Sequence, residues 1–288
     1  MLTNQTKDTQ LIDPAYQEDS GKSELTQDFP ITRFVNGVAS ASSISLARET
    51  PYTLFVNDEE ILSISTLPIQ LEELFTGFLV SEGVLLDPVE ILSTMVDRAA
   101  RIVSIDIDVP EDRLERIKKK GMLTSGCAGG IVFSVETSLQ PRSDVLPRIA
   151  IPAETISKRM NEVDLFQGVY SISRGTHASA VASLSENIII LEDIGRHNAI
   201  DKIVGYCFLN QIKPHDKMLL TTGRITSEAV TKASRFRFPI IVSRSSASST
   251  AVTMASRAHL DVVTYARAGR FNLFDHGATQ IVPSSENQ

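Results

Sequence analysis

The stretch IIILEDIGRHNAIDK, residues 188–202, decides how the second half of this chain folds. Apolar residues up to Leu191 predict a buried strand, and from Asn198 onward apolar residues recur at helical spacing. Asn198 is the predicted N-cap of that helix. The polar residues between strand and helix form a loop held at both ends, and such loops commonly carry binding or catalytic residues.

Apolar strands alternate with amphipathic helices on both sides of this stretch. The pattern predicts an α/β fold with a largely parallel or mixed sheet and helices on both faces. Ligands of such sheets bind where strands end at their carboxyl ends and loops lead into helices. The strands we expect are 178–184, 188–191, 218–222, 240–242 and 262–266, and the helices are 153–163, 198–212, 226–236 and 248–259.

The N-terminal half has a different order of elements. We expect strands over 31–39 and 51–66, the second folded at Asn57-Asp58, then a helix over 69–79 and strands at 91–96 and 102–109. This order predicts a small N-terminal α+β domain that is β-grasp-like. The predicted organisation is a disordered tail (1–29), this small domain (30–110), the larger domain (111–278) and a C-terminal tail (279–288).

Composition excludes some classes of partner. The net charge is −7 and the pI about 5.3, so no global positive field draws the chain to nucleic acid or to an anionic membrane. No apolar run approaches the ~20 residues of a membrane span, and the N-terminus lacks a basic-then-apolar export signal. We expect a cytoplasmic protein, with any anionic ligand held by a local cluster of basic residues.

The two cysteines lie in contrasting surroundings. Cys207 belongs to an apolar helical stripe within 200–208, the usual setting of a packing cysteine. Cys127 lies in Thr124–Gly130, where glycines and small hydroxyl residues cannot build an apolar wall. Cys127 is therefore the candidate for thiol chemistry, although glycine loops also carry incidental cysteines.

Four polar side chains precede or follow the predicted strands 178–184 and 188–191. His177 follows Gly175-Thr176, and Asp193, Arg196 and His197 occupy the loop before the helix. They are candidate ligand contacts. The alternatives are that His177 is a satisfied structural histidine, that Asp193 pairs with Arg196, and that His197 caps the helix.

Further arginines follow the next strands. Arg224 and Arg244 end two of them and converge on the same rim. The segment Tyr265-Ala266-Arg267-Ala268-Gly269-Arg270 sets two arginines around a glycine, a spacing that suits phosphate oxygens with a close backbone approach. The same composition is also typical of a β-hairpin turn with solvated arginines.

A zinc site of the nucleotide-deaminase kind is not expected. That chemistry needs a glutamate two residues after the first ligand and a Cys-x-x-Cys pair. Here Ser179 stands two residues after His177, and Gly130 stands where the second thiolate would follow Cys127. We expect no structural metal.

Together, these segments resemble the FdhD/NarQ family of formate dehydrogenase accessory sulfurtransferases over about residues 30–275. The resemblance rests on Thr124–Gly130, Gly175–Ala178, Glu192–Lys202, Thr222–Arg224 and Tyr265–Phe271, in family order. It implies a fold similar to that of cytidine deaminases. Many members carry Cys-x-x-Cys in the first segment, whereas this chain has only Cys127 there.

The resemblance also implies a function. Such a protein takes sulfur from a cysteine desulfurase as a persulfide on Cys127 and passes it to molybdenum or tungsten in bis-molybdopterin guanine dinucleotide, which then enters apo-formate dehydrogenase. It further implies that Tyr265–Arg270 binds this cofactor, with the arginines on the phosphates of its guanine nucleotide portion. Donor and acceptor are large, so we expect a cleft that a homodimer helps to form. Two alternatives stay open: a non-catalytic chaperone of cofactor or apo-dehydrogenase, and a metal-free nucleotide-processing enzyme.

Overall fold

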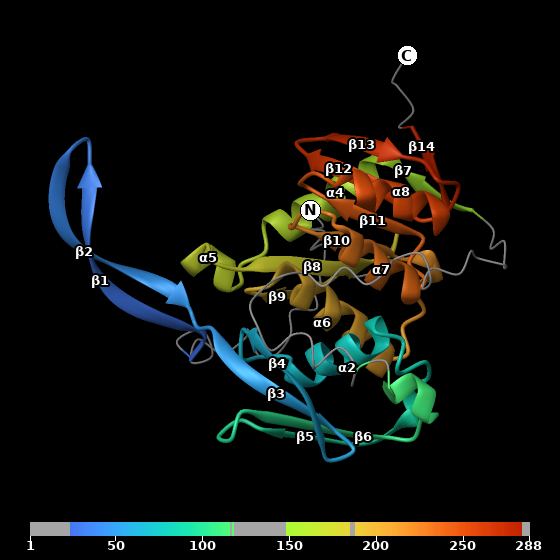
Figure 1. Ribbon diagram of the computed structural model, residues 1–288. Coiled ribbons are helices and arrows are strands. Elements are labelled where there is room, and N and C mark those ends of the chain that lie inside the picture. The colour runs from blue at the N-terminus through green and yellow to red at the C-terminus, as the bar shows by residue number, and fades with distance from the viewer. Residues whose placement is uncertain (1–23, 116, 118–147, 185–187, 284–288) are drawn as a thin grey trace, which may run out of the picture.

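The computed structural model describes residues 24–115, 117, 148–184 and 188–283. The Cys127 segment, Thr124–Gly130, lies outside these residues, as does most of the expected N-terminal tail. The described residues form two main sheets with helices between and around them (Figure 1).

The larger sheet is mixed, as the sequence predicts. Its three central strands run parallel, because β10, β11 and β12 are joined by helical crossovers, while β8 runs antiparallel to both β10 and β9. The spatial order is β13 (Arg270–Phe274), β12 (Asp261–Arg267), β11 (Ile240–Ser243), β10 (Met218–Thr221), β8 (His177–Ala182) and β9 (Ile188–Asp193).

Helices cover both faces of this sheet, which confirms that part of the expectation. Successive side chains along a strand point to opposite faces of the sheet. Leu219 packs on one face, with α6 (Arg196–Leu209), α7 (Ser227–Arg235) and α8 (Ser249–Arg257). Its neighbour Leu220 packs on the opposite face with α4 (Ala153–Asp164). A parallel pair, β7 (Ile149–Pro152) and β14 (Thr279–Val282), lies beside α4, so the segment 279–288 expected as a tail includes a strand.

The smaller sheet and one helix confirm the strand-strand-helix-strand-strand unit. Its central strands are parallel, and the turn at Asn57-Asp58 joins β3 to β4 with both residues at positive φ. The order is β4 (Glu59–Thr66), β3 (Thr50–Val56), β6 (Ile102–Ile107) and β5 (Ile91–Asp97), and the helix is α2 (Leu71–Ser81).

The expected single strand over 31–39 is wrong. Asn36 and Gly37 take φ values of 49° and 83° and make a tight turn between β1 (Thr26–Val35) and β2 (Val38–Ala47). An Asn-Gly pair is a strong hairpin signal, since both residues tolerate positive φ. β1 also begins inside the segment 1–29 that was expected to be a tail.

Helices α2 and α6 join the two sheets into one core and lie between them (Figure 1). They cross at glycines: a Cβ added to Gly77 would lie 1.8 Å from the backbone oxygen of Asp201, and one added to Gly205 would lie 1.9 Å from that of Glu73. Backbones this close leave no room for any side chain. One hydrophobic core therefore contains residues of both predicted domains.

A buried ion pair lies beside this crossing. Lys232 of α7 contacts both carboxylate oxygens of Asp201 at 2.9 and 2.8 Å, and the Ser81 hydroxyl donates to the same carboxylate at 2.6 Å. Asp201 and Lys232 are each 3% exposed. Removing one partner would leave a buried charge without compensation, so the pair fixes α2, α6 and α7 in one arrangement.

The glycine crossing gives a prediction on stability. Gly77→Ala should lower the free energy of unfolding by about 1–3 kcal/mol, because the added methyl group overpacks the helix contact. At a helical position with open space around it, the same change would raise the free energy of unfolding by about 1 kcal/mol. The sign of the measured change therefore distinguishes a crowded position from an open one. Denaturant unfolding measures it, with Glu72→Ala on the exposed face of α2 as the control. An unchanged or raised stability for Gly77→Ala would contradict the close crossing.

Candidate functional site

The loops with the candidate residues meet at one edge of the larger sheet. β10, β11 and β12 end at this edge, and the antiparallel β8 begins there, because Thr221 pairs with Ser179 and His177 pairs with Asp193. Five separate segments of the chain meet at this edge, and they contribute His177, Arg196, His197, Arg224, Arg244 and Tyr265. We call this set the rim.

Asp193 is not part of the rim surface. Its carboxylate is fully buried, lies 2.8 Å from the Lys202 Nζ and accepts hydrogen bonds from the Thr66 hydroxyl and the Leu67 N–H. The Asp193 carboxylate therefore faces the protein interior and not, as we had expected, a ligand. The alternative, that Asp193 pairs with Arg196, is also wrong, because the carboxylate pairs with Lys202 and accepts hydrogen bonds from Thr66 and Leu67. These hydrogen bonds attach the start of the loop to the end of β4 in the smaller sheet.

Asn198 is not the N-cap of α6. The helix begins at Arg196, with Gly195 as the cap residue and no side-chain cap. The Asn198 amide instead donates to Asp193 Oδ1 at 2.9 Å and to the Ser65 carbonyl at 3.0 Å. These bonds hold the loop in place from within, so that the first turn of α6 presents Arg196 and His197 at the rim.

Arg196 is a guanidinium without a counter-charge at the rim. Its stem lies against Gly223, where an added Cβ would come within 2.8 Å of the Arg196 Cβ. Its Nε is buried and has no hydrogen-bond partner among the described residues, and no carboxylate there pairs with it. A buried donor left unpaired costs free energy, so this group is suited to an anionic ligand.

The two rim histidines differ in their surroundings. His177 is half-buried, and its Nδ1 lies 3.4 Å from the Thr222 hydroxyl. Burial, followed by the nearby charges of Arg196 and Arg244, lowers the pKa of His177, so the ring is neutral at pH 7. His197 has both nitrogens engaged, Nε2 with Thr226 at 3.0 Å and Nδ1 with Glu228 at 2.9 Å. A ligand contact by His197 would have to replace one of these partners.

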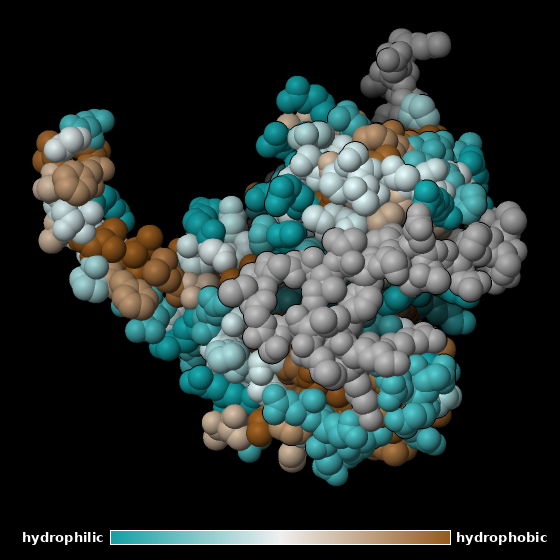
Figure 2. All heavy atoms as spheres, viewed as in Figure 1, coloured by the Kyte–Doolittle hydropathy of each residue, from teal (hydrophilic) through white to brown (hydrophobic). Residues whose placement is uncertain are grey.

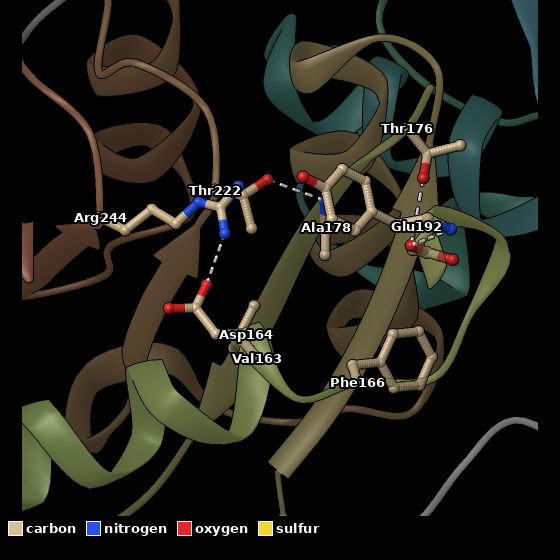
Figure 3. Close-up of a pocket in the computed structure, with 9 residues that line it drawn as sticks. Val163, Asp164, Phe166, Thr176, Ala178, Glu192, Thr222 and Arg244 are labelled. Atoms are coloured by element: carbon tan, nitrogen blue, oxygen red, sulfur yellow. Dashed lines mark hydrogen bonds and ion pairs between the residues drawn. The ribbon is translucent and has the colours of Figure 1, made fainter. Parts of the chain in front are cut away.

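A hollow of about 280 Å³, counted with its part open to solvent, lies beside the rim (Figure 3). On one side Arg244 contacts Asp164 at 2.8 Å and approaches the Tyr170 ring to 5.8 Å from its centroid. On the other side lies Glu192. The lining residues are Val163, Asp164, Phe166, Tyr170, Thr176, Ala178, Glu192, Thr222 and Arg244.

Glu192 is a fully buried carboxylate in the wall of this hollow. It accepts hydrogen bonds from the Val169 N–H at 2.6 Å, the Tyr170 N–H at 3.1 Å and the Thr176 hydroxyl at 3.2 Å. Burial raises the pKa of Glu192, while these donors partly oppose the change. Sequence reasoning did not single out this wall. The available signal was that Glu192 shares a strand face with buried Ile190, so its carboxylate had to find partners inside.

The segment Tyr265–Arg270 forms a hairpin, the alternative that the sequence left open. Ala268 and Gly269 take positive φ values of 51° and 73° at the turn between β12 and β13, and Arg267 pairs with Arg270 across it. Both arginines are exposed, as are Tyr265, Ala268 and Gly269, whereas Ala266 is buried in the core. Arg224 is exposed too. The hairpin thus presents two solvated guanidinium groups at the rim's edge, free to bind an anion.

Cys207 confirms its predicted packing role. It is fully buried in α6, and burial raises the pKa of its thiol to about 12. A thiol with such a pKa forms almost no thiolate at neutral pH.

The described ranges contain neither a metal-binding cluster nor a membrane-spanning helix. In residues 24–115, 117, 148–184 and 188–283 there is no group of three or more His, Cys, Asp or Glu side chains arranged to hold a metal ion. Within the same residues no helix has the length and apolar character needed to cross a bilayer.

The chain is similar to known proteins that share one family. The sulfur carrier protein FdhD of Bacillus licheniformis is 30% identical over 252 residues, 88% of this chain and 96% of that protein, and its namesake in Bacillus subtilis is 29% identical over 246 residues, 85% and 94% of the two chains. A crystal structure described as a candidate formate dehydrogenase accessory protein from Desulfotalea psychrophila superposes with a TM-score of 0.70 at 26% identity, covering 87% of this chain and 97% of that one. The FdhD/NarQ family model matches residues 47–281, and the chain belongs to the FdhD/NarQ family.

Proposed function

We propose that this protein is a sulfur carrier that acts through a persulfide on Cys127 and serves formate dehydrogenase. The observation that carries the proposal is the burial of Cys207. The chain has two cysteines, and Cys207 is excluded from thiol exchange by its position in the core. A sulfur carrier of this sequence therefore has Cys127 as its one usable thiol, consistent with relatives that are named sulfur carrier proteins.

The transfer from the donor needs only one nucleophilic step. The Cys127 thiolate attacks the outer sulfur of a persulfide on a cysteine desulfurase, a new S–S bond forms, and the desulfurase cysteine leaves as a thiolate. The step involves no net oxidation or reduction. Because the thiolate is the attacking form, Cys127 must be accessible and readily deprotonated. Its sequence neighbours include Gly126, Gly129 and Gly130, and glycine-rich sequences permit a close approach of backbone N–H groups to an anion.

The acceptor we propose is bis-molybdopterin guanine dinucleotide, bound as a substrate at the rim. Its phosphates require cations in an acidic chain of net charge −7. The unpaired Arg196 and the exposed Arg267 and Arg270 supply them, and the neutral His177 offers a hydrogen-bonding ring nearby. The residues present fit the group. We further propose that the larger half is cytidine-deaminase-like and the smaller half β-grasp-like.

The partners follow from this route. A cysteine desulfurase supplies the sulfur, and apo-formate dehydrogenase receives the sulfurated cofactor, in the cytoplasm. The non-catalytic chaperone remains the alternative, since it needs the same rim but no thiol. The difference between the two functions therefore rests on Cys127 alone.

Persulfide formation is the direct test. After exposure to a desulfurase and cysteine, intact-protein mass spectrometry should show about 32 Da added at Cys127, one sulfur atom. Cys127→Ala should lose the added mass and sulfur delivery. The control, Cys207→Ala, should keep both and lose stability by about 1–2 kcal/mol through its buried cavity. Sulfur delivery retained by Cys127→Ala would favour the chaperone, and labelling of Cys207 would contradict the assignment.

Nucleotide binding tests the acceptor site. Guanosine diphosphate should bind at the rim, and Arg270→Ala should weaken binding by about 1–3 kcal/mol, because a charge-assisted hydrogen bond is lost. Calorimetric titration measures it. Arg257→Ala is the matched control, since Arg257 is an exposed arginine in the last turn of α8, at the opposite edge of the sheet. Equal weakening by both variants, or equal affinity for adenosine diphosphate, would count against the site.

The zinc content of the purified protein tests the expectation that the chain has no deaminase-type zinc site. The purified protein should hold no stoichiometric zinc, because Ser179 and Gly130 replace the glutamate and the second cysteine that such a site requires. Elemental analysis and thermal unfolding with and without a chelator measure this. About one zinc per chain would revive the hydrolytic alternative.

A further inference from the structure

β5 is an edge strand of the smaller sheet and lacks the usual protection of an edge. It pairs with β6 on one side, and no strand in the described part of the chain pairs with the other. Edge strands that stay unpaired are commonly protected by charged side chains. The opposite edge strand, β4, begins with Glu59 and Glu60, whereas β5 has one charged residue, Asp97, at its last position. The free edge of β5 is therefore available to a further strand.

Large apolar side chains are exposed along this edge. Leu92 and Met95 of β5 are 67% and 59% exposed, and neither belongs to a core cluster. Leu86 and Val89, at 69% and 79%, lie just before the strand, Val89 in the short helix η2 (Pro88–Glu90). We call these four residues the apolar strip. Figure 2 shows hydrophobic atoms beside hydrophilic ones along the lower edge of the molecule, where β5 lies in Figure 1, and such exposed apolar groups mark an interaction site.

Carboxylates border the apolar strip. Asp87 is the N-cap of η2, Asp106 lies on the strand that pairs with β5, and the Asp108 N–H donates to the Glu90 carbonyl. Glu90 itself is paired with Arg113 at 2.7 Å, so this arginine is already engaged. We call Asp87, Asp106 and Asp108 the acidic border.

The acidic border belongs to a strongly acidic half of the chain. Residues 48–115 contain fifteen Asp and Glu residues, four arginines and no lysine, a net charge of −11. The whole chain has a net charge of −7, so the remaining residues together carry +4. A surface of this charge attracts and orients a basic partner, and it repels an identical surface of a second copy.

We infer that the edge of β5 binds an extended, basic segment of a partner protein as an additional strand. In this mode of recognition, main-chain hydrogen bonds to the free edge supply affinity, and alternate side chains of the segment supply specificity. Apolar side chains of the segment cover Leu92 and Met95, and the lysine or arginine side chains between them reach the acidic border. Charge thus selects a basic segment over a second copy of this chain.

This surface is separate from the rim. α2 and α6 lie between the smaller sheet, which carries β5, and the larger sheet, which carries the rim (Figure 1). β5 is also at the opposite edge of its sheet from β4, whose Ser65 accepts a hydrogen bond from Asn198 of α6. A partner at β5 and a ligand at the rim therefore occupy different parts of the molecule. The inference holds whether or not the proposed sulfur chemistry does.

A fluorescein-labelled synthetic peptide of alternating lysine and valine is the probe. Fluorescence anisotropy with the full chain gives its Kd at about 0.15 M salt, where charges farther apart than about 8 Å are largely screened. A peptide of alternating lysine and serine carries the same charge. It should bind at least about tenfold more weakly, because it lacks apolar side chains to cover the strip.

Two variants of the protein and their matched controls test the location. Leu92→Ser with Met95→Ser should weaken binding of the lysine–valine peptide by at least about tenfold, whereas Leu165→Ser, which changes a residue 63% exposed at the end of α4, should not weaken it. Asp108→Lys should weaken binding by about threefold. Glu154→Lys makes the same change of net charge on an exposed residue of α4 and should leave the Kd unchanged.

Sedimentation velocity tests a second copy as the occupant. The Leu92→Ser/Met95→Ser protein should fold like the wild type by circular dichroism and have the same assembled mass, measured against the 31.5 kDa of one copy. A lower mass for this variant than for the wild type would assign the edge to a second copy and overturn the proposal. So would a wild type that does not bind the lysine–valine peptide, equal affinity for the two peptides, or equal weakening by a variant and its control.

Discussion

The crossing of α2 and α6 at Gly77 and Gly205 is the constraint on which the rest of the structure depends. Because the two backbones touch, the small sheet and the large sheet share one hydrophobic core. The contact also fixes the position of α6, whose first turn carries Arg196 and His197. The geometry of the rim therefore depends on a helix contact in the interior of the molecule.

The polar stretch 188–202 serves two purposes that its sequence does not separate. Asp193, Asp201 and Lys202 are buried and bind partners on other elements, so they hold the loop and the helix in place. Arg196 reaches the rim and has no counter-charge among the described residues. The buried ion pairs fix the loop and the helix that carry Arg196, so we propose that little ordering of this region remains to be done when an anionic ligand binds there.

Periodicity predicted most elements of the fold, since most strands and helices bury at least one apolar face. It could not predict which polar residues are internal. Asp193 and Arg196 both follow the apolar strand in the sequence, and Asp193 is internal because of a partner such as Thr66, 127 residues earlier in the chain. The sequence did predict the contrast between Cys207 and Cys127, and Cys207 is confirmed as a core residue. It missed the turn at Asn36-Gly37, and with it the hairpin of β1 and β2, although the dipeptide itself is a hairpin signal.

The central claim is that one of the two cysteine thiols, that of Cys127, is reactive in the native protein. Titration of thiols with an aromatic disulfide reagent, first in the native protein and then in denaturant, tests it most directly. The account predicts one reactive thiol in the native protein, mapped to Cys127, and two after unfolding, because burial protects Cys207 and raises the pKa of its thiol to about 12. Two reactive thiols in the native protein, or none, would contradict it.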